Sequence, residues 1–277
     1  MIILSKKLST YFLFLVNRFQ FIGYNFLSTL RQRYCLLCSE PCENQPQNKS
    51  TSPSRIVRIC QPCIEDLPWN DLACTICALP LSNIFINPNL LNSKHICGEC
   101  FKHQAPFERV VSVFRYDFPI DSLIQKIKYQ HQRYWLKSLS TLLAIKIKQT
   151  YLPNELPEIL IPIPLHPRKK RIRSYNQAEI ISQYLSHQLG INSHNKILIK
   201  TKLTESQTSL SKKDRAKNLK GSLMLNKKAE VRGKYIAIID DVITTRATTE
   251  LATKILIKAG ATRVDIWSIA RTAKHRG

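Results

Sequence analysis

The alternation of apolar and polar positions divides the chain into a first part rich in loops and a second part in which strands alternate with helices. Four short apolar runs predict strands, at residues 110–114, 159–161, 235–239 and 264–269. Apolar residues at helical spacing predict helices in residues 120–148, 176–189 and 248–258. The last two patterns are followed by Gly190 and Gly260, which favour helix ends. The alternation predicts a parallel α/β sheet flanked by helices.

The first 33 residues are apolar and aromatic and raise the question of a targeting or membrane segment. Two lysines precede the apolar run 11–16, as in a signal peptide, but no small-residue cleavage site follows, and Asn17 and Arg18 interrupt the run. A membrane span needs about 20 mostly apolar residues. We therefore expect a helix that packs on the body of the protein, with an interfacial membrane helix as the alternative.

The charge of the chain is strongly unbalanced, with 42 Lys and Arg against 19 Asp and Glu and a formal net charge of +23. A positive field of this size concentrates polyanions, so we expect nucleic acid as the first partner class and an anionic membrane surface as the second. A basic surface that is merely solvated is the alternative. With 44% hydrophobic residues and only 7 glycines in 277 residues, the chain is globular rather than disordered and long enough for about two domains.

Eight of the nine cysteines form four Cys-x-x-Cys pairs, the arrangement that closes around zinc. Two thiolates on one tight turn can point at one ion, and two such turns complete a tetrahedron. We therefore expect two structural zinc ions and a reducing, cytoplasmic location, with the pairs joined either in sequence or interleaved. The predicted ligands are Cys35, Cys38, Cys60, Cys63, Cys74, Cys77, Cys97 and Cys100.

Other features of this cysteine-rich region have plainer interpretations. Redox-active dithiols are the alternative to zinc, but they normally lie at a helix start within a βαβ unit, whereas these pairs lie among Pro, Asn and Ser. We interpret Cys42 as an ordinary free thiol, and His95 and His103 are not needed for coordination. Residues 44–54 are polar without periodicity and predict a mobile loop.

A cluster of carboxyl and hydroxyl groups follows the apolar run 235–239. Asp240 and Asp241 end the predicted strand, and a turn rich in threonine opens the next helix. Ligands of open α/β sheets gather at the carboxyl ends of strands, and a helix N-terminus offers N–H groups and a positive dipole end to phosphate. We expect the two aspartates to hold hydroxyls of a phosphorylated sugar. The groups expected to hold its phosphate are the nearby amides and the side chains of Thr244, Thr245 and Thr248.

Two dense basic stretches favour binding of a single strand. Lys and Arg interleaved with aromatic residues hold single-stranded nucleic acid without sequence preference. The same stretches could serve the pyrophosphate of a small ligand, and we favour shared use. The first stretch consists of Arg168, Lys169, Lys170, Arg171 and Arg173, with Tyr175 beside it, and the second includes Lys212, Lys213 and Arg215.

Residues 236–249 resemble the signature of type I phosphoribosyltransferases, which is four hydrophobic residues, two acidic residues and a Thr-Thr-Gly-x-Thr loop. The resemblance implies that Asp240 and Asp241 are the catalytic acids and that residues 244–248, including Ala247, bind the 5′-phosphate of phosphoribosyl pyrophosphate, which carries Mg²⁺. Arg246 stands where that signature has glycine. We expect a turn with negative φ at this position, with the side chain either turned to solvent or folded over the phosphate.

Residues 161–177 and 204–221, together with the cysteine pairs and the segment 123–129, resemble the ComF family. The first of these segments is similar to a family pattern of Pro-x-Pro-Leu-His, a basic run and Arg-Gly-Phe-Asn-Gln, and Ser174 stands where that pattern has glycine. The resemblance implies that this segment, with Arg171 and Arg173, meets the pyrophosphate. It also implies that residues 204–221 form a flexible loop that closes over the site.

The expected organisation is a helical leader at residues 1–33, a double zinc ribbon at 34–105 and a type I phosphoribosyltransferase-like domain at 106–277. The ComF resemblance implies the handling of incoming single-stranded DNA during natural transformation, with phosphoribosyl pyrophosphate as a second ligand. Two other functions stay open: an active phosphoribosyltransferase on an unknown nitrogen acceptor, and a zinc-dependent module that recruits a helicase or another uptake protein. We do not expect the leader to contact a membrane.

Overall fold

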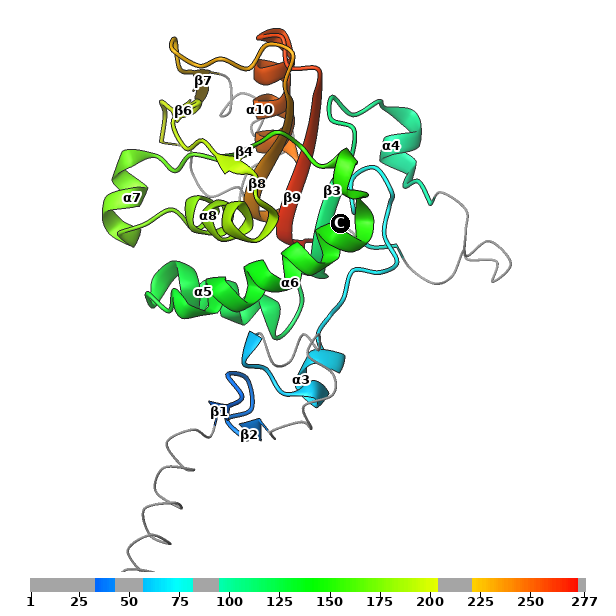
Figure 1. The fold of residues 1–277 in the computed structure, drawn as a ribbon, viewed down its shortest axis with the longest axis vertical. Helices are drawn as coiled ribbons and strands as arrows, with labels where there is room; N and C mark the ends of the chain where they lie inside the picture. The colour runs from blue at the N-terminus through cyan, green and yellow to red at the C-terminus, as the bar shows by residue number, and fades with distance from the viewer. Residues whose placement is uncertain (1–32, 43–56, 82–94, 204–220, 274–277) are drawn as a thin grey trace, which may run out of the picture. The chain divides into compact units, whose positions relative to one another are not determined.

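The computed structural model describes residues 33–42, 57–81, 95–203 and 221–273 (Figure 1). Contacts along the chain divide it into two compact units, Met1–Asp66 and Leu67–Gly277. The predicted leader, the predicted loop at 44–54 and the predicted closing loop with Lys212, Lys213 and Arg215 lie outside the described residues. The predicted domain boundaries at 33 and 105 stay predictions.

The first unit is built around two tight turns that carry cysteines. Strands β1 (Arg33–Tyr34) and β2 (Pro41–Cys42) pair in antiparallel fashion on either side of the first turn. The second turn leads into helix α3 (Gln61–Glu65), whose N-cap is Cys60. Pro62 suits the first turn of this helix, where a backbone N–H would have no helical partner.

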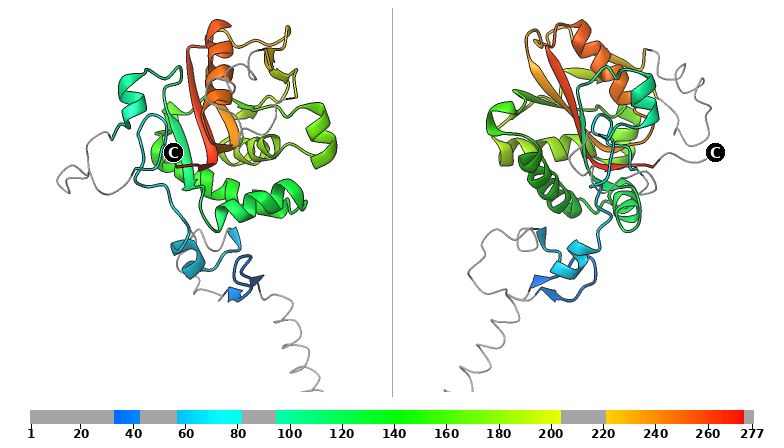
Figure 2. Two further views of the ribbon diagram at one scale, coloured as in Figure 1. Left: turned by 180° about the vertical axis from the view of Figure 1, so that it is seen from behind. Right: turned by 90° about the vertical axis from the view of Figure 1, so that its right-hand side faces the viewer.

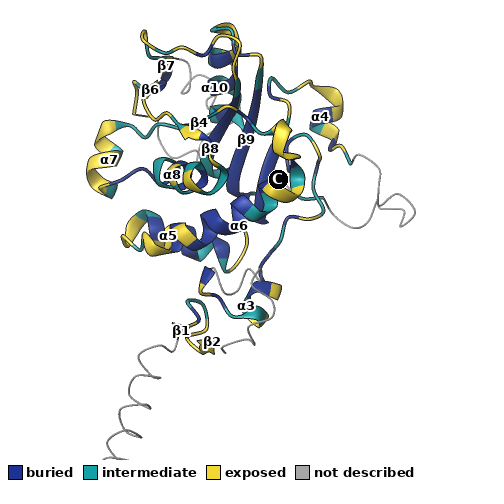
Figure 3. Cartoon of the chain, viewed as in Figure 1, coloured by how far each residue is buried: buried dark blue, intermediate teal, exposed yellow. Residues whose placement is uncertain are grey.

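A five-stranded sheet forms the centre of the second unit, and every neighbouring pair of its strands is parallel. This arrangement confirms the predicted fold class. The strand order is β3 (Val110–Arg115), β9 (Arg263–Arg271), β8 (Tyr235–Ile243), β4 (Ile159–Pro162) and β5 (Asn192–Ser193). The four predicted strands are all present, and the central pair β8 and β9 is buried over most of its length (Figure 3).

Helices cover both faces of the sheet (Figure 2). Helices α6 (Tyr134–Thr150) and α8 (Gln177–Leu189) pack against each other and against one face. Helix α10 (Ala247–Lys258) lies on the other face, where Ala252 and Leu256 share an apolar core with Ile236 and Ile238 of β8. Gly190 ends α8 in the left-handed conformation, as the sequence predicts.

The predicted helix at 120–148 is two helices in the structure. Helix α5 (Ile120–Tyr129) and α6 are separated by residues 130–133, within which His131 has a φ of 57°. The intervening Gln130, Gln132 and Arg133 have no apolar side chain that would anchor a continuing helix to the sheet. Apolar periodicity is interrupted at this point, which explains the break.

Several shorter elements complete the second unit. Helix α4 (Gly98–Lys102) follows a cysteine turn, helix α7 (Pro167–Arg173) follows β4, and a short 3₁₀ helix covers Pro153–Glu155. Strands β6 (Leu198–Lys200) and β7 (Leu223–Leu225) form an antiparallel hairpin outside the main sheet. Across the described segments, every helix is too short or too polar to cross a bilayer.

Candidate functional site

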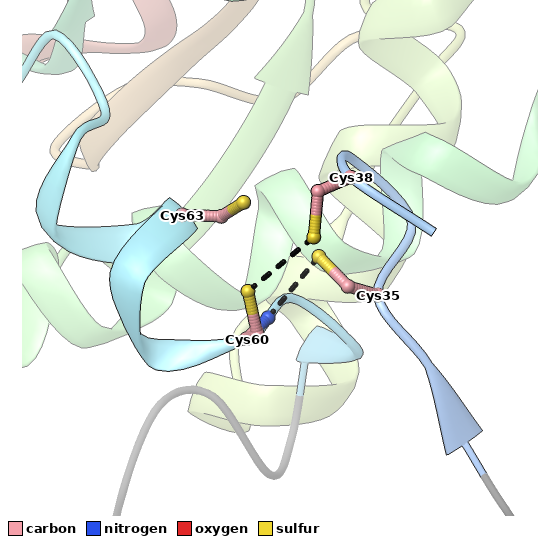
Figure 4. Close-up of side chains that lie close together, drawn as sticks. All are labelled: Cys35, Cys38, Cys60 and Cys63. Carbon is pink, nitrogen blue, oxygen red and sulfur yellow. Dashed lines mark hydrogen bonds between the residues drawn. The ribbon is translucent and has the colours of Figure 1, made fainter. Parts of the chain in front are cut away.

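The first cysteine cluster joins the first two Cys-x-x-Cys pairs. The sulfur atoms of Cys35, Cys38, Cys60 and Cys63 all lie within 4.8 Å of one another. Figure 4 shows the four side chains converging, with 3.7 Å between the sulfurs of Cys38 and Cys60. The backbone N–H of Cys60 donates to the sulfur of Cys35 over 3.3 Å, which orients that thiolate toward the other three.

The second cluster joins the other two pairs in the same way and is buried throughout. Cys74, Cys77, Cys97 and Cys100 also have all four sulfurs within 4.8 Å, and the sulfurs of Cys77 and Cys97 are 3.6 Å apart. The backbone N–H of Cys97 donates to the sulfur of Cys74 over 3.3 Å. These four residues belong to the apolar core on the α10 face of the sheet, so this cluster is part of the second compact unit.

Both clusters fit a zinc ion. A tetrahedron with Zn–S bonds of about 2.3 Å has sulfur atoms about 3.8 Å apart, close to the separations observed. The pairs are joined in sequence, which decides between the two pairings that the sequence left open. Cys42 and the two nearby histidines, His95 and His103, lie outside both sets.

The two aspartates lie inside β8 rather than after it, because the strand continues to Ile243. The prediction that the strand ends at the acidic pair was therefore wrong. Val242 and Ile243 are apolar and continue the pairing with β9, where they lie opposite Ala270 and Arg271, respectively.

Lys128, near the end of α5, forms an ion pair with Asp241. Its Nζ lies 2.7 Å from Oδ2 of Asp241, and the two side chains are only 20% and 16% exposed. Burial acts to lower the pKa of Lys128, but the Asp241 and Asp240 carboxylates raise it overall. Burial, followed by the charge of Asp241, raises the pKa of Asp240 to about 8. Lys128 lies in the segment 123–129 that resembles the ComF family, but no feature of the sequence predicted its ion pair with Asp241.

Further cations surround these carboxylates. Burial lowers the pKa of Lys169, and the charges of Arg173 and Lys128 lower it further. Burial and then the charge of Lys169 lower the pKa of Lys200 to about 8, while Asp240 acts in the opposite direction. The predicted Lys169 and Arg173 therefore share one electrostatic environment with the acidic pair. Lys200, on the β6–β7 hairpin, has no motif around it that could have identified it.

The expectation of negative φ at Arg246 was wrong. Arg246 has a φ of 65° and is the N-cap residue of α10. Its carbonyl oxygen accepts hydrogen bonds from the N–H of Glu250 and from Oγ1 of Thr249, so the left-handed residue closes the first turn of the helix. Ser174 also has a φ of 65°. Both residues thus have the left-handed backbone conformation that glycine adopts most easily, which is unfavourable for a non-glycine residue by roughly 1 kcal/mol.

The side chain of Arg246 takes neither of the two expected directions. Its Nη1 donates to the sulfur of Cys100 over 3.3 Å, and its Nε lies 3.3 Å from Oε1 of Glu250. Only 14% of the side chain is exposed. The guanidinium therefore contacts the second cysteine cluster. In this position the backbone of Arg246 can still contact a phosphate bound at residues 244–248, but its guanidinium cannot.

The first basic stretch forms helix α7 and its cations divide between two environments. His166 accepts a hydrogen bond from the N–H of Arg168 and caps the helix. Arg168, Lys170 and Arg171 are exposed, whereas Lys169 and Arg173 are half-buried and interact electrostatically with Lys128 beside the acidic pair. The structure therefore separates an outward group of three cations from an inward group of two.

The aromatic residues near α7 differ from the expected one. Tyr175 is buried and donates a hydrogen bond to the carbonyl of Ile127, so it cannot stack on a base in this arrangement. Tyr129 is 68% exposed and lies 5.3 Å from the Arg173 guanidinium, measured from ring centroid to Cζ. Tyr134 is 55% exposed. These two tyrosines replace Tyr175 as candidates for stacking.

Comparison with solved structures finds phosphoribosyltransferases at low similarity. A purine phosphoribosyltransferase from Pyrococcus horikoshii is 18% identical, with a TM-score of 0.32 over 50% of this chain and 83% of that chain. The glutamine phosphoribosylpyrophosphate amidotransferase of B. subtilis is 20% identical, with a TM-score of 0.31 over 48% and 25%. Likenesses of this size support no argument about function.

Comparison with curated sequences finds much closer relatives, whereas no protein-family model matches. Competence protein F of Haemophilus influenzae is 37% identical over 179 residues, which is 63% of this chain and 78% of that protein. DNA utilization protein YhgH of Salmonella typhi is 30% identical over 218 residues, 77% and 90% respectively. The YhgH protein of Escherichia coli K12 is 28% identical over 216 residues, with the same coverage. With this identity over most of the relatives' length, two four-cysteine clusters and a parallel sheet, the chain belongs to the family of competence protein F and YhgH, which is the ComF family that its motifs resemble.

Proposed function

We propose that this protein handles single-stranded DNA during its uptake or use, in the cytoplasm, and that it binds phosphoribosyl pyrophosphate at the carboxyl end of β8. The relatives named competence protein F and DNA utilization protein support the DNA role. The observation that carries the ligand site is the half-buried acidic pair, which forms an ion pair with Lys128 and shares its electrostatic environment with Lys169, Arg173 and Lys200. Carboxylates and cations together suit a ligand that has both hydroxyls and phosphates.

The proposed ligand is held at two ends. Asp240 and Asp241 accept hydrogen bonds from its ribose hydroxyls, and the backbone of residues 244–248 with the α10 N-terminus holds the 5′-phosphate. Thr244 and Thr245 are exposed on that loop, and Thr248 lies in the first turn of the helix. Arg173 and Lys200 face the pyrophosphate, whereas Arg171, which the resemblance also assigns to the pyrophosphate, belongs to the exposed group on α7. Mg²⁺, when bound with the ligand, neutralises part of the pyrophosphate charge.

The proposed DNA surface is the outer side of α7 together with the end of α5. Arg168 and Arg171 supply exposed positive charge, and so does Lys170, which also forms an ion pair with Glu179. Tyr129 at the end of α5 supplies an exposed ring, and Tyr134 at the start of α6 supplies another. Stacking on aromatic rings and contacts between cations and phosphates bind a single strand regardless of sequence. Because Arg173 touches Tyr129 and also lies near the acidic pair, the two surfaces adjoin.

A second candidate function is an active phosphoribosyltransferase. The acidic pair favours it, because these carboxylates could stabilise the ribose as pyrophosphate leaves and a nitrogen nucleophile attacks C1. The nitrogen acceptor is not defined by any group described above. Recruitment of a helicase or another uptake protein by the cysteine-rich region is compatible with either function.

We further propose that each four-cysteine cluster holds one structural zinc ion. All eight sulfurs are used in two complete sets, so no ligand position is left for water or substrate. Metal analysis of protein purified without chelator should find about two zinc ions per chain.

The ligand site is tested by calorimetric titration with phosphoribosyl pyrophosphate and Mg²⁺. Native protein should bind, whereas the double variant Asp240→Asn, Asp241→Asn should lose at least about tenfold in affinity, because carboxylates accept stronger hydrogen bonds than amides. Asp71→Asn, which changes an exposed carboxylate elsewhere in the unit, is the matched control and should bind normally. Absence of binding by the native, folded protein would remove phosphoribosyl pyrophosphate from this proposal.

A further inference from the structure

Two arginines connect the second cysteine cluster to the loop at residues 244–247. Arg246 belongs to the loop itself and donates from Nη1 to the sulfur of Cys100. Arg271, at the end of β9, is buried and donates from Nε to the carbonyl of Cys77 over 3.2 Å. Its Nη1 donates to the carbonyls of Ile243 and Thr244, over 3.0 Å and 2.5 Å. One guanidinium therefore binds the cysteine turn and the start of the loop together.

The negative charge of a zinc ion with four thiolates would explain why these arginines contact the cluster. Four thiolates around Zn²⁺ leave a net charge of about −2, which is costly inside an apolar core. A guanidinium that donates to a coordinated sulfur offsets part of that charge through a charge-assisted hydrogen bond. The second cluster is fully buried, whereas Cys38 of the first cluster is exposed, so the need for such a partner is greater at the second.

The conformation of Arg246 fits this use. A left-handed conformation is unfavourable for arginine, so contacts of its side chain must hold it in place. The observed contacts are Cys100 on one side of the guanidinium and Glu250 on the other. A glycine would suit the backbone at this position but would supply neither contact.

We propose that Arg246 is an outer ligand of a zinc ion at Cys74, Cys77, Cys97 and Cys100, meaning that it donates a hydrogen bond to a coordinating sulfur without binding the metal itself. Through this contact the ion positions the loop at residues 244–247. The proposal rests on the zinc sites proposed above and makes the second site more than a structural support. Zinc at this cluster, Arg246 and the loop form one unit, in which loss of the ion or of the guanidinium loosens the other two. The first cluster belongs to the other compact unit and serves as an internal reference.

Zinc release from the intact protein tests the outer-ligand role. After metal analysis has established two ions per chain, release to a chromogenic chelator is followed for native protein, Arg246→Gly and Arg246→Asn. Glycine and asparagine both tolerate the left-handed backbone, so these variants remove the guanidinium without adding strain. We expect one ion to leave about tenfold faster or more, as outer-shell losses typically produce, and the other ion to leave at the native rate.

Ser174→Gly is the matched control, because it relieves another left-handed residue with the same φ and touches neither cluster. Its release rates should equal those of native protein. Equal release from Arg246→Gly and native protein would overturn the outer-ligand role. Fewer than two ions in native protein would instead refute the zinc sites themselves, so the two failures are distinguishable.

A spectroscopic readout separates a direct contact from general loosening. With Co²⁺ replacing Zn²⁺, loss of the hydrogen bond to sulfur in Arg246→Asn should move the thiolate charge-transfer absorption of one site to longer wavelength. Arg246→Lys, which can still donate to the sulfur, should lie closer to the native position. Amide hydrogen exchange then tests the coupling: in zinc-loaded Arg246→Asn, residues 244–248 should exchange faster than in native protein, while α8 is unchanged. Unaltered absorption would contradict the contact, and unaltered exchange would contradict the coupling.

Discussion

At the scale of single residues, the site combines predicted side chains with others that only the fold brings to it. The acidic pair and the threonine-rich loop follow from a local motif, and so does the pairing of cysteines three positions apart. Lys128 pairs with Asp241 from α5, and Lys200 on the β6–β7 hairpin is influenced by the charge of Asp240. Sequence spacing carries no information about such contacts between distant segments, so these two residues could not be assigned in advance.

The backbone at Ser174 gives the first prediction. Ser174→Gly should stabilise the protein by roughly 0.5–1 kcal/mol, because glycine adopts positive φ without a steric penalty but loses more entropy on folding. Urea unfolding measures the difference. Ser186→Gly, inside helix α8, is the control and should destabilise by a similar amount. A loss of stability in Ser174→Gly would show that the left-handed conformation does not persist in solution.

The raised pKa of Asp240 gives a prediction about pH. Its folded-state pKa of about 8 exceeds the unfolded value, so ionisation opposes folding. This cost is absent below the unfolded pKa, grows as the pH rises, and is complete above the folded pKa. Asp240→Asn should therefore stabilise the protein at pH 8, by on the order of 1 kcal/mol or more, and change little at pH 4.

Unfolding curves at the two pH values test this expectation, with Asp71→Asn as a control whose carboxylate is 71% exposed. The control should show no comparable dependence on pH. If Asp240→Asn were equally stable relative to native protein at both values, Asp240 would titrate as an ordinary carboxylate.

At the scale of elements, apolar periodicity predicted four of the five sheet strands and the ends of α8, because those patterns report burial directly, but it missed the two-residue edge strand β5. It failed where a tertiary contact extends an element, as in β8, which runs past its acidic pair because β9 continues beside it. It also failed where polar residues interrupt a helix, as between α5 and α6. The φ of Arg246 was mispredicted because residue type alone disfavours a conformation that the helix start and the cysteine cluster impose.

A buried polar network holds β8, β9 and α6 together away from the ligand site. Asp265 is fully buried and accepts hydrogen bonds from the hydroxyls of Tyr151 and Tyr235, over 2.6 Å and 2.7 Å, and from Arg263. Asp265→Ala should destabilise the protein by about 3 kcal/mol, because it leaves two buried hydroxyls and a cation without their acceptor. Chemical denaturation measures the loss.

Glu158→Ala is the control for that network. Glu158 forms an ion pair with Lys234 in which both side chains are 47% exposed, and exposed pairs contribute little to stability. A comparable loss in the control, or none in Asp265→Ala, would contradict the importance given to the buried network.

At the scale of the whole molecule, the net charge of +23 indicates a polyanionic partner but does not say where it binds. The fold narrows the choice by exposing three cations on α7 and by placing the exposed ring of Tyr129 against Arg173 at the end of the same helix. Basic residues occur elsewhere on the second unit too, for example Lys227, Lys228 and Arg232, which are exposed on the turn before β8. Binding at one specific surface and binding through the overall charge therefore predict different effects when basic residues are replaced on α7 or on the turn before β8.

The most direct test is the binding of a fluorescent single-stranded oligonucleotide, measured by anisotropy as a function of salt concentration. Native protein should lose affinity steeply with salt, with a log-log slope of several units, because counterions are released from several phosphates. The triple variant Arg168→Gln, Lys170→Gln, Arg171→Gln should bind at least about tenfold more weakly and with a shallower slope.

The control variant Lys227→Gln, Lys228→Gln, Arg232→Gln removes the same charge from the turn before β8 and should keep nearly native affinity and slope. That outcome would support the α7 surface as the DNA site. Equal weakening by both variants would mean that binding follows net charge alone, and native behaviour of the α7 variant would place the DNA elsewhere. Either of these two results would contradict the central proposal.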